Sequence, residues 1–373
     1  MTQQAQHGFD LDQTFVAARQ QQAEGRLDEA KRLYGKIMGR VPHHAESLIM
    51  LASIAYQQGD EVQAEAYLDR AIGIYQAVLK QMPGLLRVHA PLVNVLLARR
   101  RPSEAEGYAE TLQRPIHPIR AEPAEFERRR RDGMARKLPV MLINTVPKSA
   151  SESIWNKLAE GLNLAQGHLS LGLFPDCCLL PHRVRAAAQG GLIAKEHISA
   201  TPFNLKVLAE SGLDRVVCHL RDPRQATLSW VHFVRDDVSM RLMAPIWRKI
   251  VPPSGLAGQD LAAQIDWSIE NYLPLLIEFI RGWREVQQDA AQPVKVLFLG
   301  FEEFRVAPEA YFSKVLDFYG IDPSRFVQEK EAEVVHLRKG LLGEWREVFS
   351  AAQQERAWSL IPAELAEAFG WQP

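Results

Sequence analysis

One stretch, residues 139–154, most constrains how this chain can fold. It begins with an apolar run that ends at Thr145 and is rich in Val, Ile and Leu, a length and composition that predict a buried β-strand. A short polar loop follows. Apolar residues then recur at helical spacing, namely Ile154, Trp155, Leu158 and Leu162. The stretch therefore predicts a strand, a tight loop and a helix.

The loop has the composition of an anion-binding site. Backbone N–H groups at the start of a helix lack partners within the helix and carry a partial positive charge, so the loop before them can hold a phosphate. Lys148 adds a full charge, and the serines add donors. The loop lacks both glycines of the GxxxxGK[ST] motif, so an ordinary ATP or GTP site is not expected. A plain turn with a serine cap and an exposed lysine is the alternative interpretation.

Length and charge narrow the class of protein. A chain of 373 residues suits two domains and a large core. The net charge of -1 predicts no bulk attraction to nucleic acid or to a membrane. The 3 cysteines form no CxxC pattern, which favours a reducing compartment over a disulfide framework or zinc site. No segment has the apolar length of a signal peptide or membrane span, so we expect a cytoplasmic protein.

Residues 9–113 carry an internal repeat and no pattern typical of strands. The same interval of about 34 residues separates Gly25 from Gly59, Ala18 from Ala52 and Ala30 from Ala64. A third copy follows after a longer interval. A helix–turn–helix unit with a period of about 34 residues resembles the tetratricopeptide repeat. It offers either a concave surface for a protein partner or a brace for the second domain or for self-association, and both interpretations stay open.

Residues 114–138 form a boundary before the second domain, residues 139–373. Three prolines block a continuous helix at its start. The four arginines at 128–131 predict a solvated linker helix rather than a nucleic-acid site, because no aromatic residue is interleaved with them.

Residues 190–199 predict a second short strand, which ends in Lys195, Glu196 and His197. An imidazole titrates near neutral pH, so His197 is a candidate general base. A structural histidine is the alternative.

Residues 215–234 predict a third strand, a turn that starts at Arg221, and a helix that carries Ser229 two turns later. This spacing lets Arg221 and Ser229 converge on one phosphate, for which the forked N–H groups of arginine are suited. An arginine–aspartate turn that caps the helix is the alternative.

These segments, taken in order, resemble sulfotransferases that use 3′-phosphoadenosine 5′-phosphosulfate (PAPS). The matching stretches are PKSASES (147–153), AKEH (194–197), RDPRQATLSWVHF (221–233) and RKGLLGEWR (338–346). The resemblance covers about residues 139–371. It implies an α/β fold of the P-loop-NTPase-like class, a parallel sheet flanked by helices that follows the all-α repeat domain, with the ligand at the carboxyl ends of the strands.

The resemblance also implies a role for each matching residue. His197 corresponds to the general base, and Lys148 and Lys195 would stabilise charge on the leaving and transferring oxygens. The residues that would hold the 5′-phosphosulfate are Lys148, Ser149, Ala150, Ser151, Glu152 and Ser153. Those that would hold the 3′-phosphate are Arg221, Ser229, Arg338, Lys339 and Gly340. No metal is implied.

Three positions in the loop depart from the family pattern. Ala150 stands where many members have glycine, and Glu152 puts a carboxylate beside a phosphate. Ser153 replaces a tryptophan that often stacks on adenine in the cytosolic aryl enzymes, so the adenine partner is open.

The expected activity is sulfuryl transfer from PAPS to a hydroxyl or amine, with 3′-phosphoadenosine 5′-phosphate (PAP) as product. The acceptor stays open among saccharides, lipids, small alcohols and peptides, and whether residues 240–264 form a lid over it is also open. A nucleotide kinase on a related phosphate-loop fold is one alternative, which the missing glycines disfavour. A repeat scaffold with a vestigial nucleotide domain is another, which the joint presence of Lys148, His197 and Arg221 disfavours.

Overall fold

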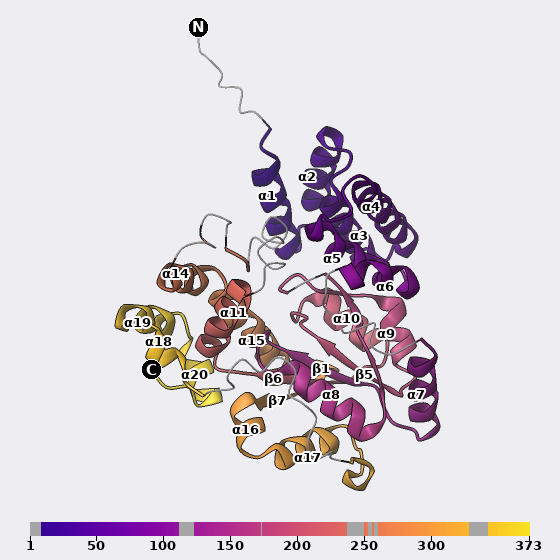
Figure 1. The fold of residues 1–373 in the computed structure, drawn as a ribbon. Helices are drawn as coiled ribbons and strands as arrows, with labels where there is room; N and C mark the ends of the chain where they lie inside the picture. Colours follow the sequence, from indigo (N-terminus) through magenta and orange to yellow (C-terminus); the bar gives the residue numbers. More distant parts are fainter. Residues whose placement is uncertain are drawn as a thin grey trace. The chain divides into compact units, whose positions relative to one another are not determined.

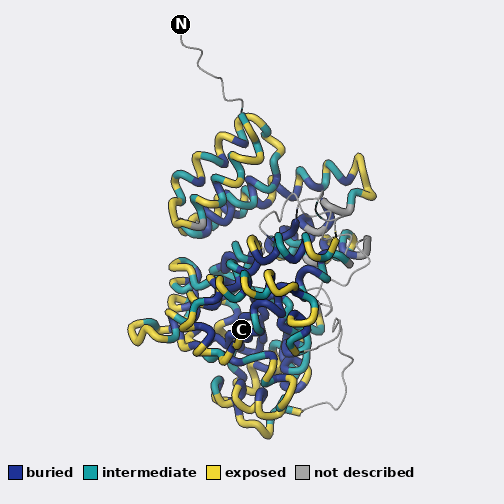
Figure 2. Tube along the Cα trace, turned by 90° about the vertical axis from the view of Figure 1, so that its left-hand side faces the viewer, coloured by how far each residue is buried: buried dark blue, intermediate teal, exposed yellow. Residues whose placement is uncertain are grey.

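The computed structural model describes residues 9–111, 123–172, 174–236, 250–252, 256, 260–327 and 342–373. The chain divides into two compact units, residues 1–116 and 117–373 (Figure 1). In each unit the buried residues lie inside the packed helices and strands (Figure 2). Within these described ranges, no helix combines the length and apolarity needed to cross a membrane.

The first unit is a series of helices. They are α1 (Leu11–Ala23), α2 (Leu27–Arg40), α3 (Ala45–Gln57), α4 (Glu61–Gln81), α5 (Leu86–Ala98) and α6 (Pro102–Thr111). They pack as successive pairs, α1 with α2, α3 with α4 and α5 with α6. Helix α4 has 21 residues against 14 for α2, and this difference of seven accounts for the longer interval before the third copy.

Small residues hold the repeats together where the sequence predicted them. The repeated alanines have no exposed surface, namely Ala18, Ala30, Ala52, Ala64 and Ala105. Gly25 and Gly59 end α1 and α3 in the left-handed conformation, with φ of 76° and 81°. The third copy places Arg100 in this conformation (φ 57°), a cost that glycine avoids.

The second unit is built on a five-stranded parallel sheet with the order β2-β5-β1-β6-β7. Its strands are β1 (Met141–Thr145), β2 (Ala165–Gly167), β5 (Leu192–Glu196), β6 (Arg215–Leu220) and β7 (Lys295–Gly300). A separate antiparallel pair consists of β3 (Ser170–Leu171) and β4 (Cys178–Leu179). The predicted α/β class, a parallel sheet preceded by a helical repeat region, is confirmed.

Helices cover both faces of the sheet, which is why its central strands are apolar along most of their length. One face packs against α8 (Ser151–Leu162), α16 (Phe301–Val306) and α17 (Pro308–Phe318) (Figure 1). The other packs against α9 (Pro181–Ala187), α10 (Pro202–Glu210), α11 (Pro223–Asp236) and α15 (Leu273–Gln288). Alternate strand residues serve the two cores, so Met141 and Ile143 face α8 while Leu142 faces the opposite side.

Further helices surround this framework. They are α7 (Pro123–Ala135), α14 (Leu261–Asn271), α18 (Trp345–Val348), α19 (Ala351–Ser359), α20 (Ala363–Phe369) and a 3₁₀ turn at Pro323–Arg325.

Helix α7 lies in the segment predicted as a solvated linker, but it packs against β2 as part of the second unit. Arg130 Nη2 donates to the carbonyl of Ala186 at 2.5 Å, and Arg136 Nη2 donates to that of Leu162 at 2.7 Å. Gly133 and Gly191 make this close approach possible, because a Cβ on Gly133 would lie 2.7 Å from Gly191 Cα. The arginine run thus includes a structural contact that its charge alone did not predict.

The Gly191→Ala substitution tests this packing. Gly191 has φ of 71°, and an added Cβ would overlap the carbonyl oxygen of Arg130. We expect a loss of about 3 kcal/mol in the free energy of unfolding, from left-handed strain together with overpacking. Gly212→Ala is the matched control, since its φ is 73° with nothing within 4 Å, and should lose only about 1 kcal/mol. Equal losses in urea titrations of the two variants would contradict the contact with α7.

Candidate functional site

The candidate site lies at the carboxyl edge of β5, β1 and β6, which are neighbours in the sheet. Because the strands are parallel, the residues after each strand meet at one edge. Lys148 follows β1, His197 follows β5 and Arg221 follows β6. The structure therefore gathers on one edge three segments that are far apart in the sequence.

The loop from Val146 to Ala150 is held in an uncommon backbone conformation. Lys148 and Ala150 both have φ of 68°, in the left-handed region. Ser149 has no exposed surface, and its Oγ donates to the carbonyl of Val146 at 2.7 Å. The Ser149 side chain therefore shapes the turn, which leaves its backbone N–H as the group that could meet an anion.

Helix α8 begins directly after this loop, with Ala150 at its N-cap and no side-chain cap hydrogen bond. Ser151 is buried and Ser153 half-buried in its first turn. Since a side chain does not cap the first-turn N–H groups, this helix start keeps the donors that an anion site needs. The alternative of a serine-capped turn is not what the structure shows.

Lys148 and Arg221 both contact aromatic rings beside the loop. Lys148 Nζ lies 4.1 Å from the centre of the Phe233 ring, on α11. Ser229 precedes Phe233 by one helical turn, so it shares that face of α11. Arg221 is buried, with its guanidinium 4.1 Å from the Phe301 ring and its Nη1 donating to the carbonyl of Lys148 at 3.1 Å. Lys148, Arg221 and the Ser229 face of α11 thus lie around one loop.

Lys195 is buried and forms an ion pair with Glu152. Its ammonium lies 5.2 Å from the centre of the Trp155 ring. The pair links the end of β5 to the first turn of α8. Glu152, whose carboxylate was unfavourable beside a phosphate, is directed to a compensating cation, and the Lys195 charge is correspondingly neutralised.

His197 is held in one tautomer. Its Nδ1 lies 2.6 Å from the carbonyl oxygen of Thr145, and because a carbonyl only accepts, Nδ1 carries the proton. The lone pair is then on Nε2. Burial, with the positive charge of Lys195 second, lowers the pKa of His197 to about 4. The imidazole is neutral at neutral pH, as a proton acceptor must be.

Asn144 is a site residue that the sequence analysis missed. It is fully buried at the end of β1, and its side-chain amide pairs with both backbone groups of Ile198, at 3.0 Å and 2.9 Å. Trp283 Nε1 donates to the same carbonyl at 2.8 Å. These bonds fix the residue after His197. A buried asparagine within an apolar strand requires such partners. The sequence MLINT could therefore have identified Asn144 as a buried hydrogen-bonding residue.

Glu196 points to the side of β5 opposite Lys195 and His197, as strand alternation requires. It accepts hydrogen bonds from the Leu169 N–H and from Ser170 Oγ. Burial raises the pKa of Glu196 to about 7. His168 Nδ1 lies 3.8 Å from its carboxylate, and burial lowers the pKa of His168 to about 3.

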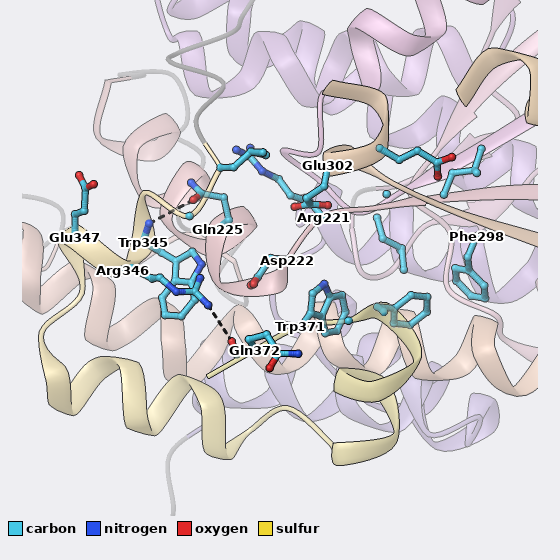
Figure 3. A pocket seen from close by; sticks show the side chains of 18 residues that line it. Arg221, Asp222, Gln225, Phe298, Glu302, Trp345, Arg346, Glu347, Trp371 and Gln372 are labelled. Atoms are coloured by element: carbon cyan, nitrogen blue, oxygen red, sulfur yellow. Dashed lines mark hydrogen bonds between the residues drawn. The ribbon is translucent and has the colours of Figure 1, made fainter. Parts of the chain in front are cut away.

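A cavity of about 780 Å³ lies beside Arg221 at the ends of β6 and β7 (Figure 3). Its walls include the aromatic residues Phe298, Trp345 and Trp371, with carboxylates from Asp222 and Glu302. Among the predicted ligand residues that the structure describes, only Arg221 lines it. The ring of Trp345 is contacted by the guanidinium groups of Arg224 and Arg346, at 3.8 Å and 4.3 Å from its centre. A planar ring in this cavity could pack against Phe298 and Trp371.

Some of the predicted residues have no described geometry. Arg338, Lys339 and Gly340 lie outside the described residues, as does most of the segment 240–264. Within the described parts of the chain, no group of three or more His, Cys, Asp or Glu side chains could hold a metal ion.

Comparisons with known proteins bear on both units. Residues 21–73 match the tetratricopeptide repeat family model, so the predicted repeat is confirmed there. No curated protein matches the chain. Among solved structures, the chain is similar to mouse sulfotransferase SULT7A1 complexed with PAP, with a TM-score of 0.43 and 16% sequence identity. The match covers 66% of this chain and 92% of that chain.

The buried histidines make stability depend on pH. Burial lowers the pKa of His168 to about 3 and those of His197 and His219 to about 4, so in the folded state they stay neutral where unfolded histidines take up protons. Their stabilising contribution is complete above about pH 6.5 and is lost as the pH falls through 4. Glu196 acts in the opposite sense, because its raised pKa makes its contribution fall as the pH rises through 7.

Histidines with a lowered pKa, which also include His44, outnumber the carboxyl groups with a raised pKa, Glu196 and Glu302. We therefore expect the free energy of unfolding to rise between about pH 4.5 and 6.5, by roughly 1.4 kcal/mol per pH unit for each proton of the difference. Urea titrations across this range measure the slope. His168→Gln should reduce this slope by about 1.4 kcal/mol per pH unit, the amount that corresponds to one proton. An unchanged slope would mean that His168 is not held neutral.

Proposed function

We propose that the second unit is a PAPS-dependent sulfotransferase that acts on an acceptor hydroxyl or amine. The observation that carries this proposal is the meeting of Lys148, a neutral His197 and Arg221 at one edge of the sheet, each in a segment that resembles its sulfotransferase counterpart. PAPS would supply a sulfuryl group attached to a 5′-phosphate leaving group. The residues at this edge fit such a co-substrate, because the loop offers backbone donors and the cations stand beside it.

Two groups of residues would bind the two charged ends of PAPS. The loop backbone and Lys148 would hold the 5′-phosphosulfate, together with the backbone N–H groups of Ser151, Glu152 and Ser153 in the first turn of α8. Arg221 and Ser229 would hold the 3′-phosphate, together with Arg338, Lys339 and Gly340. Arg221 also lines the aromatic cavity, and Trp371, which lines it too, would contact the adenine ring.

His197 would act as general base through Nε2, since Nδ1 is occupied by the Thr145 carbonyl. Lys148 would stabilise the charge that builds on the transferring oxygens. Lys195 is paired with Glu152 in the structure, so it could contribute to catalysis only after that carboxylate turns away. The acceptor class and a cytoplasmic location remain predictions from the sequence. The repeats would recruit a protein partner or a second copy of the chain.

Calorimetric binding of PAP, with AMP and ADP as controls, tests the proposal. We expect wild-type protein to prefer PAP to AMP by more than about tenfold, because charge-assisted hydrogen bonds to the 3′-phosphate contribute roughly 1.5–3 kcal/mol. Arg221→Ala should abolish this preference. Trp371→Ala should weaken PAP and AMP alike if the adenine enters the cavity.

No preference for PAP would contradict the proposal. Magnesium-dependent ATP turnover would then favour a kinase, and the absence of both activities would favour a scaffold.

A screen of acceptors with labelled PAPS tests the role of His197 as general base. His197→Ala should lower turnover by about 10²–10⁴ and leave PAP affinity unchanged, because the imidazole acts on the acceptor. Lys148→Ala should lower both turnover and PAP affinity. His43→Ala, an exposed residue of the first unit, is the control. Wild-type turnover in His197→Ala would exclude His197 as the base.

A further inference from the structure

His219 is a buried histidine that the proposed chemistry does not use. It lies in β6 with no exposed surface, and it contacts the candidate loop twice. Its Nε2 lies 2.6 Å from the carbonyl oxygen of Ser149, and its own carbonyl accepts from the Val146 N–H at 3.2 Å. A plain apolar side chain would have filled this core position without reaching the loop.

Tyr311 sets the tautomer of His219. The Ser149 carbonyl only accepts, so His219 Nε2 carries the proton and Nδ1 carries the lone pair. The hydroxyl of Tyr311, on α17, lies 2.9 Å from that Nδ1 and donates to it. Tyr311 also has no exposed surface. The result is a fixed chain of donors, from Tyr311 through His219 to Ser149.

The loop needs this support because it has no glycine. Lys148 and Ala150 both adopt the left-handed conformation, which costs a residue with a Cβ about 1–2 kcal/mol. Within the described residues, the Lys148 carbonyl is held by Arg221 and the Ser149 carbonyl by His219. His219 lies near the end of β6, and Arg221 follows directly after β6. Arg221 is itself the predicted 3′-phosphate ligand.

The hydrogen bond from His219 to the Ser149 carbonyl also orients the next backbone N–H group. In a planar trans peptide the C=O and the following N–H point in opposite directions. By holding the Ser149 carbonyl, His219 turns the N–H of Ala150 away from itself. Ala150 is the N-cap of α8, so this N–H belongs to the group of donors that would meet an anion.

We propose that His219, oriented by Tyr311, is a positioning residue that holds the glycine-free loop in its anion-binding conformation. Its hydrogen bond offsets the strain that a glycine would avoid in the left-handed conformation. The proposal rests on the proposed function for the identity of the anion, the 5′-phosphosulfate.

The first experiment compares two amides at position 219. His219→Gln can place an N–H near the position of Nε2, whereas the side chain of His219→Asn is too short to reach Ser149. We expect His219→Asn to weaken PAP binding about tenfold and His219→Gln to remain within about threefold of wild type. Adding Ala150→Gly to His219→Asn should restore binding, because glycine removes the left-handed cost. Equal weakening by Asn and Gln, with no recovery from Ala150→Gly, would overturn the proposal.

The second experiment needs no nucleotide. Amide hydrogen exchange should become faster in residues 146–151 of His219→Asn, remain slow there in His219→Gln, and be unchanged in β7 of both. Faster exchange throughout the sheet, or none in the loop, would show that His219 only fills the core. If wild-type protein bound no PAP, the proposed function would fail, and the exchange pattern would still decide whether His219 holds the loop.

Discussion

Parallel pairing of β1 with β5 and β6 is the constraint on which the candidate site depends. It brings the carboxyl ends of three strands to one edge, so Lys148, His197 and Arg221 meet although they are far apart in the sequence. The helices on both faces exclude water from these strands, which is why each strand can be apolar along most of its length. Any change that shifted this register would separate the predicted base from the predicted phosphate ligands.

Polar residues inside the strands are the second element of the site. Asn144 fixes the backbone beside His197, and His219 fixes the loop beside Lys148. Each is fully buried, and each directs hydrogen bonds to backbone groups. A buried polar group is costly unless it is paired, so these residues favour only the native arrangement of the loop and of the segment after β5. This gives a physical reason for polar residues in otherwise apolar strands.

Charge balance gives the two lysines of the site different surroundings. Lys148 lies against an aromatic ring, whereas Lys195 is paired with a carboxylate from the helix whose start would hold the anion. The departure at Glu152 therefore has a local explanation in the structure. It also means that Lys195, which the resemblance treats like Lys148, would have to give up an ion pair before it could contact an anion.

The sequence by itself determined the periodic elements and the order of the segments. The apolar runs at 215–220 and near 141–145 specified β6 and β1, and the spacing of glycine and alanine specified the repeats, because these patterns are local. It did not predict β2, which is too short to show a pattern, or the packing of α7, which depends on Gly133 and Gly191 from distant parts of the chain. The partners of Lys195, His197 and His219 were decided only by the tertiary structure, because they lie on different strands and helices and each hydrogen bond needs both ends in place.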